Sequence, residues 1–494
     1  MKKVLLFLVD SMMPKILDQC ITQGKAPAFQ FLIEKGQYIN DCVTVFPTMT
    51  ASIDCSLITG VYPDEHKVPG LVWYDPSTKK IINYINGAFP VYSLGLDHCG
   101  KNVLFDLNER HMSKDVKTIH EELEERGYTS GSINVIAHRG HKKHETKIPF
   151  LLDAATRFRL KEKVSGPTIL SMGTLIKPEI FRPINWNWSQ SIVSSYGLND
   201  AYAIDVLIEV IKSGQQPDFT LIYLPDNDHK LHRSPSKAVD HLSQVDKEVA
   251  RFLDSYDSWD EAIEKNVCIF VSDHGQTIIG TSKEHNIYLD KLLASLKIHK
   301  FASTPGPDDE IVICNNERMC FIYPLHPEVQ PKLIDLLVQE PNIEVIAWKE
   351  EEWVNVRRGG SPTKLSFKKE GPFVDIYQTN WSIEGDFSIL DLQQQPDGTI
   401  YYDDYPDAMA RLYGALFAQE IPVVAVSATP SYEFVSECSP QHLGGGSHGS
   451  LHKIDSIVPL IMAGSDLQVP KPARLVDLKA FIMEKLLLPD PLPV

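Results

Sequence analysis

Three short apolar runs in this chain each end abruptly at an acidic cluster. Val4–Val9 runs into Asp10, Phe219–Leu224 into Pro-Asp-Asn-Asp at 225–228, and Val267–Val271 into Ser-Asp-His-Gly at 272–275. Apolar runs without polar alternation are typical of parallel strands that are buried on both faces. Helical patterns lie between these runs, which is the order of βαβ units. The sequence therefore predicts an α/β fold with a mostly parallel sheet flanked by helices.

The other predicted elements continue this alternation. Helices are predicted where apolar residues recur at helical spacing, several of them ending at or just before a glycine. The predicted helices are 27–35, 51–58, 116–126, 201–213, 242–252 and 408–419, and the further strands of the core are 423–426 and 457–462.

A segment of different character interrupts the pattern. Two loop-like stretches, 303–307 and 393–398, bracket strand-like runs such as 311–314, 320–323 and 343–348. Helical patterns are less prominent between them. We therefore predict an inserted α+β cap subdomain at 303–398. The α/β core is then discontinuous in sequence and comprises 1–302 and 399–494.

The charge balance limits the class of partner. Acidic residues outnumber basic ones by 65 to 48, so the formal net charge is −17. This is unfavourable for binding a phosphate backbone, which argues against a nucleic-acid scaffold. A small phosphorylated substrate is compatible with it. No apolar run approaches the roughly 20 residues of a membrane span.

Cysteine usage and the first residues indicate the compartment. The eight cysteines are scattered, without a CxxC pair or zinc-ribbon spacing. A disulfide framework is not expected in a chain of this length, so we interpret them as reduced thiols in a cytoplasmic protein. Met-Lys-Lys before Val4–Val9 resembles a signal peptide, but the apolar run has only six residues and ends at Asp10. We interpret the run as a buried strand with a functional carboxylate at its end.

Thr50 and Asp10 are the first candidates for chemistry. Thr50 precedes the predicted helix 51–58, where free N–H groups and the helix dipole favour an anion. A hydroxyl at this position becomes a nucleophile if a metal ion lowers its pKa. The alternative for Thr50 is a plain helix N-cap. The alternative for Asp10 is a cap or a turn residue.

Two further clusters combine carboxylates with imidazoles. Asp228 and His232 are four residues apart, so one helical turn brings them together, and Asp226 with His229 is the competing pair. Either pair supplies two ligands of a zinc-like site, and a solvated polar loop is the alternative. Asp273 and His274 follow the third apolar run, and glycine after them permits a turn in which both converge.

A glycine-rich loop surrounds the last candidate. Residues 444–450 read Gly-Gly-Gly-Ser-His-Gly-Ser, without the Lys-Ser/Thr ending of a P-loop. We expect the glycines to let the backbone approach a site and direct His448 into it, with His452 as a nearby competitor.

In their order along the chain, these segments resemble the alkaline phosphatase superfamily, and within it the type I phosphodiesterase/nucleotide pyrophosphatase family. The resemblance covers nearly the whole chain apart from the insertion. It is carried by Val9-Asp10, by 46–50 leading into Thr-Gly-Val-Tyr-Pro-Asp-Glu-His at 59–66, by Asp228-x-x-x-His232, by Ser-Asp-His-Gly at 272–275 and by Gly-Ser-His-Gly at 446–449.

The resemblance implies an alkaline-phosphatase-like core that holds two divalent metal ions, most commonly zinc, with manganese as the alternative. It implies that Thr50 is the nucleophile and that a phospho-threonine intermediate is hydrolysed by water. The implied ligands of one ion are Asp228, His232 and His448, and those of the other are Asp10, Asp273, His274 and the Thr50 oxygen. The expected function is a two-metal phosphodiesterase.

Departures from the family pattern narrow this expectation. Nucleotide-cleaving members have an asparagine where this chain has Leu71, which argues against a nucleotide pyrophosphatase. The chain lacks the Cys-x-Pro-x-Arg signature of sulfatases. Its insertion follows the Asp-His-Gly cluster, whereas in related mutases it follows the nucleophile. The alternatives are a phosphomutase or phosphotransferase, a phosphomonoesterase or phosphonate hydrolase, and a non-catalytic binding module.

An aromatic pair is the candidate for the substrate pocket. Trp73 and Tyr74 could stack on a leaving group, and packing in the core or at its rim is the alternative.

Overall fold

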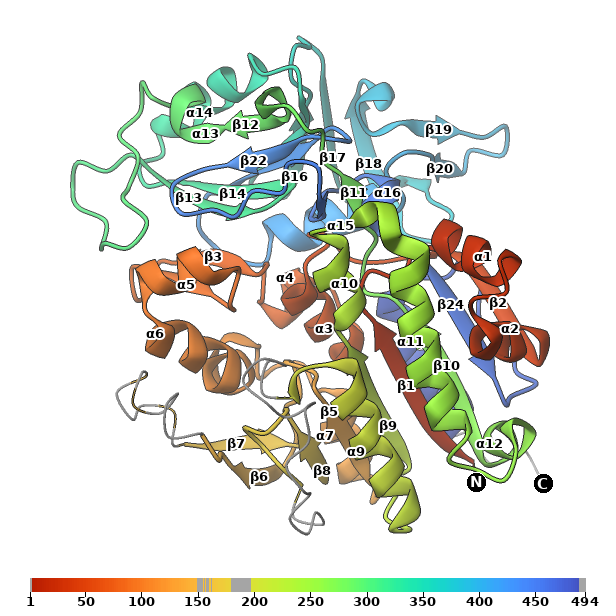
Figure 1. Ribbon diagram of the computed structural model, residues 1–494. Helices are drawn as coiled ribbons and strands as arrows, with labels where there is room; N and C mark the ends of the chain where they lie inside the picture. Colours follow the sequence, from red (N-terminus) through yellow and green to blue (C-terminus); the bar gives the residue numbers. More distant parts are fainter. Residues whose placement is uncertain are drawn as a thin grey trace.

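The computed structural model describes residues 2–148, 162–178 and 197–487, together with residues 154, 156 and 160. Within these residues two seven-stranded sheets organise the chain (Figure 1). The strands of the first sheet, in spatial order, are β2 (Gly36–Val43), β24 (Ile457–Ala463), β10 (Asn266–Val271), β1 (Lys3–Val9), β9 (Phe219–Leu224), β5 (Ser130–Ile133) and β8 (Ile169–Ser171).

The first sheet is mostly parallel, as predicted. β1 lies between β9 and β10 and is parallel to both, and β5 is parallel to β9 and β8. β24 is antiparallel to its neighbours β10 and β2. Leu5 and Phe7 of β1 face one apolar cluster and Leu6 and Leu8 face another, which explains why this strand lacks polar alternation.

Helices cover both faces of this sheet. The face of Leu5 and Phe7 packs against α1 (Pro14–Thr22), α2 (Pro27–Glu34), α9 (Asp200–Lys212), α11 (Ala238–Leu253) and α12 (Trp259–Lys265). The face of Leu6 and Leu8 packs against α3 (Thr50–Thr59), the π-helix η1 (Asn102–His111), α7 (Ile119–Glu125), α17 (Leu478–Phe481) and the π-helix η8 (Ile482–Leu487). Figure 1 shows α9 and α11 in front of the sheet.

The predicted helix 116–126 is shorter in the structure. α7 begins at Ile119 because Thr118 caps it: Glu121 N donates to Thr118 Oγ1 (3.1 Å) and Thr118 N donates to Glu121 Oε2 (2.9 Å). Such a reciprocal pair fixes the start of a helix.

The second sheet is antiparallel. Its strands, in spatial order, are β13 (Ile311–Asn316), β14 (Met319–Pro324), β21 (Val424–Ala428), β15 (Ile343–Glu350), β16 (Trp353–Arg357), β17 (Lys364–Val374) and β18 (Asn380–Gly385). The predicted cap, 303–398, contains all of these strands except β21, which lies in the part assigned to the core. A short apolar run looks the same in either sheet, so the sequence pattern did not distinguish them. The division into core and cap stays a prediction.

Smaller elements join the two sheets. The helices are α4 (Pro63–His66), α5 (Ala88–Leu94), α6 (Leu96–Lys101), α10 (Asp226–Leu231), α13 (Leu289–Leu292), α14 (Val329–Val338), α15 (Ala408–Leu416) and α16 (Lys453–Ser456), with the 3₁₀ turns 235–237, 283–285, 387–390 and 475–477. The strand pairs are β3 (Val72–Asp75) with β4 (Lys80–Asn83), β6 (Lys142–Glu145) with β7 (Lys163–Gly166), β11 (Thr277–Ile278) with β23 (Gly446–Ser447), β12 (Asn286–Tyr288) with β22 (Glu433–Val435), and β19 (Leu392–Gln394) with β20 (Ile400–Tyr402).

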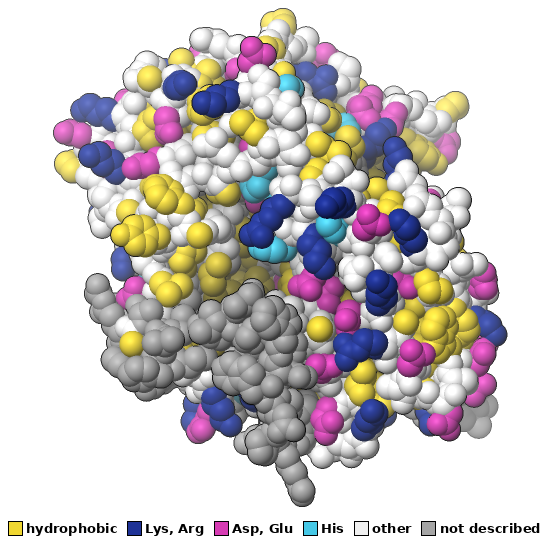
Figure 2. Space-filling model, viewed as in Figure 1, with side chains coloured by type: hydrophobic (Ala, Val, Ile, Leu, Met, Phe, Trp, Pro, Cys, Tyr) yellow, Lys and Arg dark blue, Asp and Glu magenta, His cyan; other side chains and the backbone are white. Residues whose placement is uncertain are grey.

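The structure shows where the charged side chains and the cysteines of the chain lie. Acidic and basic side chains are mixed over the face drawn in Figure 2, which is hollowed near its centre. All eight cysteines are free thiols, and all except the half-buried Cys438 are buried. None of the helices in the described ranges is long and apolar enough to cross a membrane.

Candidate metal centre

The candidate residues meet at one edge of the first sheet. β1, β9 and β10 are adjacent and parallel, so their carboxyl ends lie side by side. Asp10, the cluster 225–228 and the Asp273-His274 pair follow these three ends. In open α/β sheets this edge is where ligands bind.

Four residues form what we call the Asp10 group: Asp10, Thr50, Asp273 and His274. His274 Nε2 lies 3.6 Å from Asp10 Oδ1 and 3.4 Å from Asp273 Oδ2. Asp10, Asp273 and His274 are each at most 3% exposed. Asp10, Asp273 and His274 present ligand atoms that are all within 4.8 Å of one another, as expected for donors that surround one ion.

Thr50 is the first residue of α3. The N-cap is Met49, in an extended conformation, and Thr50 does not cap the helix. Its Oγ1 instead donates to Asp273 Oδ2 at 3.4 Å. The helix ends ten residues later, with Gly60 in the left-handed conformation (φ 73°). The hydroxyl is therefore directed into the Asp10 group, where the helix N-terminus also faces it.

Three residues form the His232 group: Asp228, His232 and His448. Asp228 lies in α10 and His232 one turn later, with 3.2 Å between His232 Nε2 and Asp228 Oδ2. His232 Nδ1 is 2.8 Å from the carbonyl of Gly446. A carbonyl only accepts, so Nδ1 carries the proton and Nε2 is the atom free for a metal.

The glycine-rich loop brings His448 to the same place. Its Nδ1 donates to the carbonyl of Thr48 (2.7 Å), which leaves Nε2 3.8 Å from Asp228 Oδ1. A Cβ atom on Gly446 would lie 1.9 Å from Gln276 Oε1, and one on Gly449 would lie 2.5 Å from the carbonyl of Asn316. The loop can approach the other segments this closely only because these positions lack side chains.

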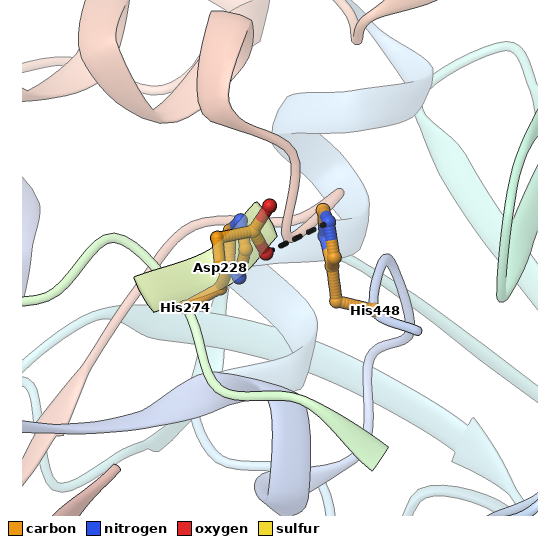
Figure 3. A group of neighbouring side chains, drawn as sticks. All are labelled: Asp228, His274 and His448. Atoms are coloured by element: carbon orange, nitrogen blue, oxygen red, sulfur yellow. Dashed lines mark ion pairs between the residues drawn. The ribbon is translucent and has the colours of Figure 1, made fainter. Parts of the chain in front are cut away.

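The two groups are in contact. The rings of His274 and His448 stack with centroids 3.7 Å apart and planes at 15°. Figure 3 shows the Asp228 carboxylate directed toward His448. Asp228, His274 and His448 also present ligand atoms within 4.8 Å of one another, so the groups form one continuous set of donors.

Burial and neighbouring charges shift the pKa values of the carboxylates and histidines at the site. Burial raises the pKa of Asp10 well above its usual range, and the nearby Asp228 and Asp273 raise it further. Burial would also raise the pKa of Asp228, but His232 and the other two histidines lower it well below its usual range. Burial lowers the pKa of His448, and the stacked His274 lowers it further.

The donor set fits divalent cations. Asp10 Oδ1 and His274 Nε2 are both buried and make no hydrogen bond within the described part of the chain. Buried polar atoms rarely lack a partner, and a cation between these two would satisfy both. Neutral imidazole with carboxylate is the ligand set that zinc prefers.

The structure separates the competing residues from these groups. Asp226 lies beside Asp200, whose Oδ1 accepts from Asp226 N (2.9 Å), and it is in none of the ligand groups found in the described ranges. His229 is exposed. His452 accepts from Ile454 N at the start of α16 and packs against Tyr405.

Trp73 and Tyr74 are packed side chains of β3. Their exposed fractions are 6% and 5%. Trp73 makes an edge contact with His111 and lines a cleft of about 1110 Å³, and Tyr74 packs against Tyr323. Neither residue belongs to the ligand groups, so stacking on a substrate stays a prediction.

Sequence reasoning missed several polar residues at the site, among them Tyr223, Ser11 and Glu317. Tyr223 donates a hydrogen bond to Asp10 Oδ2, and Ser11 Oγ donates to Asp228 Oδ1 (2.8 Å). Ser11 directly follows Asp10, which is the only signal for it. Glu317, at the tip of the β13–β14 hairpin, is 3.8 Å from His448 Nε2 through Oε2. An acidic residue between two strand-like runs resembles an ordinary turn residue.

Comparison with known proteins gives one family match. The family model described as type I phosphodiesterase / nucleotide pyrophosphatase matches residues 4–451. A search of curated protein sequences gives no match.

Similar solved structures include human ectonucleotide pyrophosphatase / phosphodiesterase 5, with 16% identity over 98% of this chain and 94% of that chain and a TM-score of 0.57. An inactive threonine-to-alanine variant of the mouse protein in complex with AMP has 14% identity over 98% of this chain and 94% of that chain, with a TM-score of 0.56. Phosphonoacetate hydrolase from Sinorhizobium meliloti 1021, in complex with phosphonoformate, has 14% identity over 97% of this chain and 94% of that chain, with a TM-score of 0.55. At these identities the likeness establishes the fold.

Proposed function

The chain belongs to the type I phosphodiesterase / nucleotide pyrophosphatase family and is a phosphoester hydrolase, and from this premise we propose that it is a two-metal phosphodiesterase with Thr50 as nucleophile. The observation that carries the proposal is the position of the Thr50 hydroxyl. It stands at the N-terminus of α3 and donates to Asp273 inside the Asp10 group. The proposed substrate is a small phosphorylated molecule, and a cytoplasmic location stays a prediction.

Each ligand group holds one ion in this proposal. The Asp10 group holds one through Asp10, Asp273, His274 and the Thr50 oxygen, and the His232 group holds the other through Asp228, His232 and His448. Zinc is the proposed ion, with manganese as the alternative. When bound, the ions supply positive charge that lowers the pKa of the threonine hydroxyl and offsets the charge of the phosphoryl group.

The chain's own residues then position the reaction. Asp273 orients Thr50 Oγ1, which attacks phosphorus while the bond to the leaving oxygen breaks. The first N–H groups of α3 have no partners within the helix and face the phosphoryl oxygens. Water hydrolyses the resulting phospho-threonine and restores Thr50.

Leu71 argues against a nucleotide pyrophosphate as substrate. Its side chain packs at the edge of the first core and offers no amide to a phosphoryl group. The nearby Asn316 does not replace that amide, because its Oδ1 accepts from Leu71 N (3.0 Å) and Val72 N (2.9 Å) and its Nδ2 donates to backbone carbonyls.

Thr50→Ala tests the nucleophile. We expect turnover of a chromogenic phosphodiester to fall by at least about 10³-fold, because the attacking oxygen is lost. Thr59→Ala is the matched control, since it removes a hydroxyl at the other end of α3 that donates to Cys55 O within the same helix. Full activity in Thr50→Ala would contradict the mechanism. Mass spectrometry should find about two divalent ions per wild-type chain and phosphate on Thr50 after rapid quenching.

A substrate screen tests the class. Phosphodiesters, phosphomonoesters, phosphonates and nucleotides are compared with zinc and with manganese, each with and without an alcohol acceptor. We expect the highest kcat/KM for diesters and release to water. Transfer to the acceptor as the main reaction would favour a phosphotransferase, and a preference for phosphonates would favour a phosphonate hydrolase.

A further inference from the structure

Glu317 reaches the site from the second sheet. It occupies the two-residue turn between β13 and β14, in the left-handed conformation (φ 62°), and is 6% exposed. The left-handed turn is uncommon for a side chain of this size. Two backbone bonds hold the hairpin against the rest of the site: Arg318 N donates to His448 O (2.9 Å) and Phe434 N donates to Glu317 O (2.9 Å).

The Glu317 carboxylate is directed at two histidines of the His232 group. Its Oε2 accepts from Ser447 Oγ (3.0 Å) and from His448 N (3.3 Å), and lies 3.8 Å from His448 Nε2. Ligand atoms of Glu317, His232 and His448 are all within 4.8 Å of one another. For His448 this atom is Nε2, which the bond from Nδ1 to the Thr48 carbonyl leaves free.

We propose that Glu317 is a fourth protein ligand of the ion held by Asp228, His232 and His448. The inference rests on the two-metal function proposed above. The separations here are 3.2 Å from His232 Nε2 to Asp228 Oδ2, 3.8 Å from His448 Nε2 to Asp228 Oδ1 and 3.8 Å from His448 Nε2 to Glu317 Oε2.

Charge gives an independent reason. The Asp10 group offers two carboxylates to its ion, whereas the His232 group offers one. A second carboxylate would offset more of the charge of a divalent ion there. Glu317 provides a second carboxylate, so that each group offers two.

Zinc titration of the metal-free full-length protein tests this. Calorimetry with a competing chelator should resolve two sites in the wild type. Glu317→Gln keeps the shape but removes the charge, and we expect one site to weaken by about 10- to 100-fold while the other is unchanged. Glu317→Asp keeps the charge but shortens the reach, and should weaken the same site. Glu310→Gln, at the other end of β13, is the matched control and should bind as the wild type does.

The outcomes separate the two proposals. Fewer than two sites in the wild type would contradict the two-metal function itself. Two wild-type sites that persist unchanged in Glu317→Gln would overturn the role of Glu317 alone. Wild-type affinity in Glu317→Asp would also overturn it, because charge without direct ligation would then suffice. Thermal unfolding of the metal-free variants establishes that each is folded.

Discussion

The two ligand groups of this site are built in different ways. In the Asp10 group, Asp10 follows strand β1, and Asp273 and His274 follow strand β10 of the same sheet. The apolar residues of these two strands are buried in the core, which holds the strand ends in place. The His232 group combines a short helix with a glycine-rich loop, and the tip of a hairpin from the second sheet lies against both. The first group is positioned by regular structure, whereas the second depends on long-range contacts between irregular segments.

The second group depends on buried polar contacts for its support. Arg318 is fully buried, and its Nη1 donates to Asp455 Oδ2 (2.5 Å), Thr277 Oγ1 (2.8 Å) and Ser450 Oγ (2.9 Å). These bonds tie the hairpin to β11 and to the segment that follows His448. Buried charges of this kind fix a geometry, but the loss of one partner is severe.

Replacing Asp455, whose carboxylate pairs with Arg318 of the β13–β14 hairpin, should have the largest effect on stability. Asp455→Asn leaves the buried Arg318 without its counter-charge, and we expect a loss of about 3–5 kcal/mol in the free energy of unfolding. Urea denaturation measures it. Asp404→Asn is the control, because it breaks a half-exposed pair with Lys453 worth under about 1 kcal/mol. Equal losses in the two variants would mean that the pair does not support the hairpin.

Replacing Asp228, but not its neighbour Asp226, should have an intermediate effect, which is on the affinity for zinc. Asp228→Asn should weaken zinc binding at one site by at least about 100-fold, or roughly 2.7 kcal/mol, because a charged ligand is lost. Asp226→Asn changes a carboxylate two residues away that lies beside Asp200, and should leave both affinities unchanged. The reverse result would assign the ligand to Asp226.

The smallest effect, taken per pH unit, is a pH dependence of stability near the hairpin. Burial raises the pKa of Glu344 to about 8, although Arg318 nearby lowers it. The folded state therefore holds a proton that the unfolded state has released above pH 4.5. Stability from this group is present at low pH and is lost as pH rises to about 8, by about 1.4 kcal/mol per pH unit at most. Glu344→Gln should flatten urea denaturation midpoints between pH 5 and pH 8. Parallel profiles for the two proteins would contradict this.

The sequence predicted the parts of the molecule in which local pattern and position agree. Asp10, Asp273 and His274 follow buried strands directly, so the topology of the sheet alone brings them together. The prediction that Asp228 and His232 lie together required a helical turn between them. Their spacing did not exclude Asp226 as the ligand instead of Asp228. The role of β21 in the second sheet depends on its partners β14 and β15, which no local pattern encodes. Glu317 depends on how that sheet docks, so its position was not predictable.

The hairpin that carries Glu317 has a consequence for how the whole chain holds together. An ion shared by Asp228, His448 and Glu317 is a cross-link between the first sheet, the C-terminal loop and the second sheet, each distant from the others in sequence. Like a disulfide, it closes long loops, and it also contributes its binding free energy to the folded state. If Glu317 is a ligand as proposed, we expect chelation to loosen the docking of the two sheets as well as to lower activity.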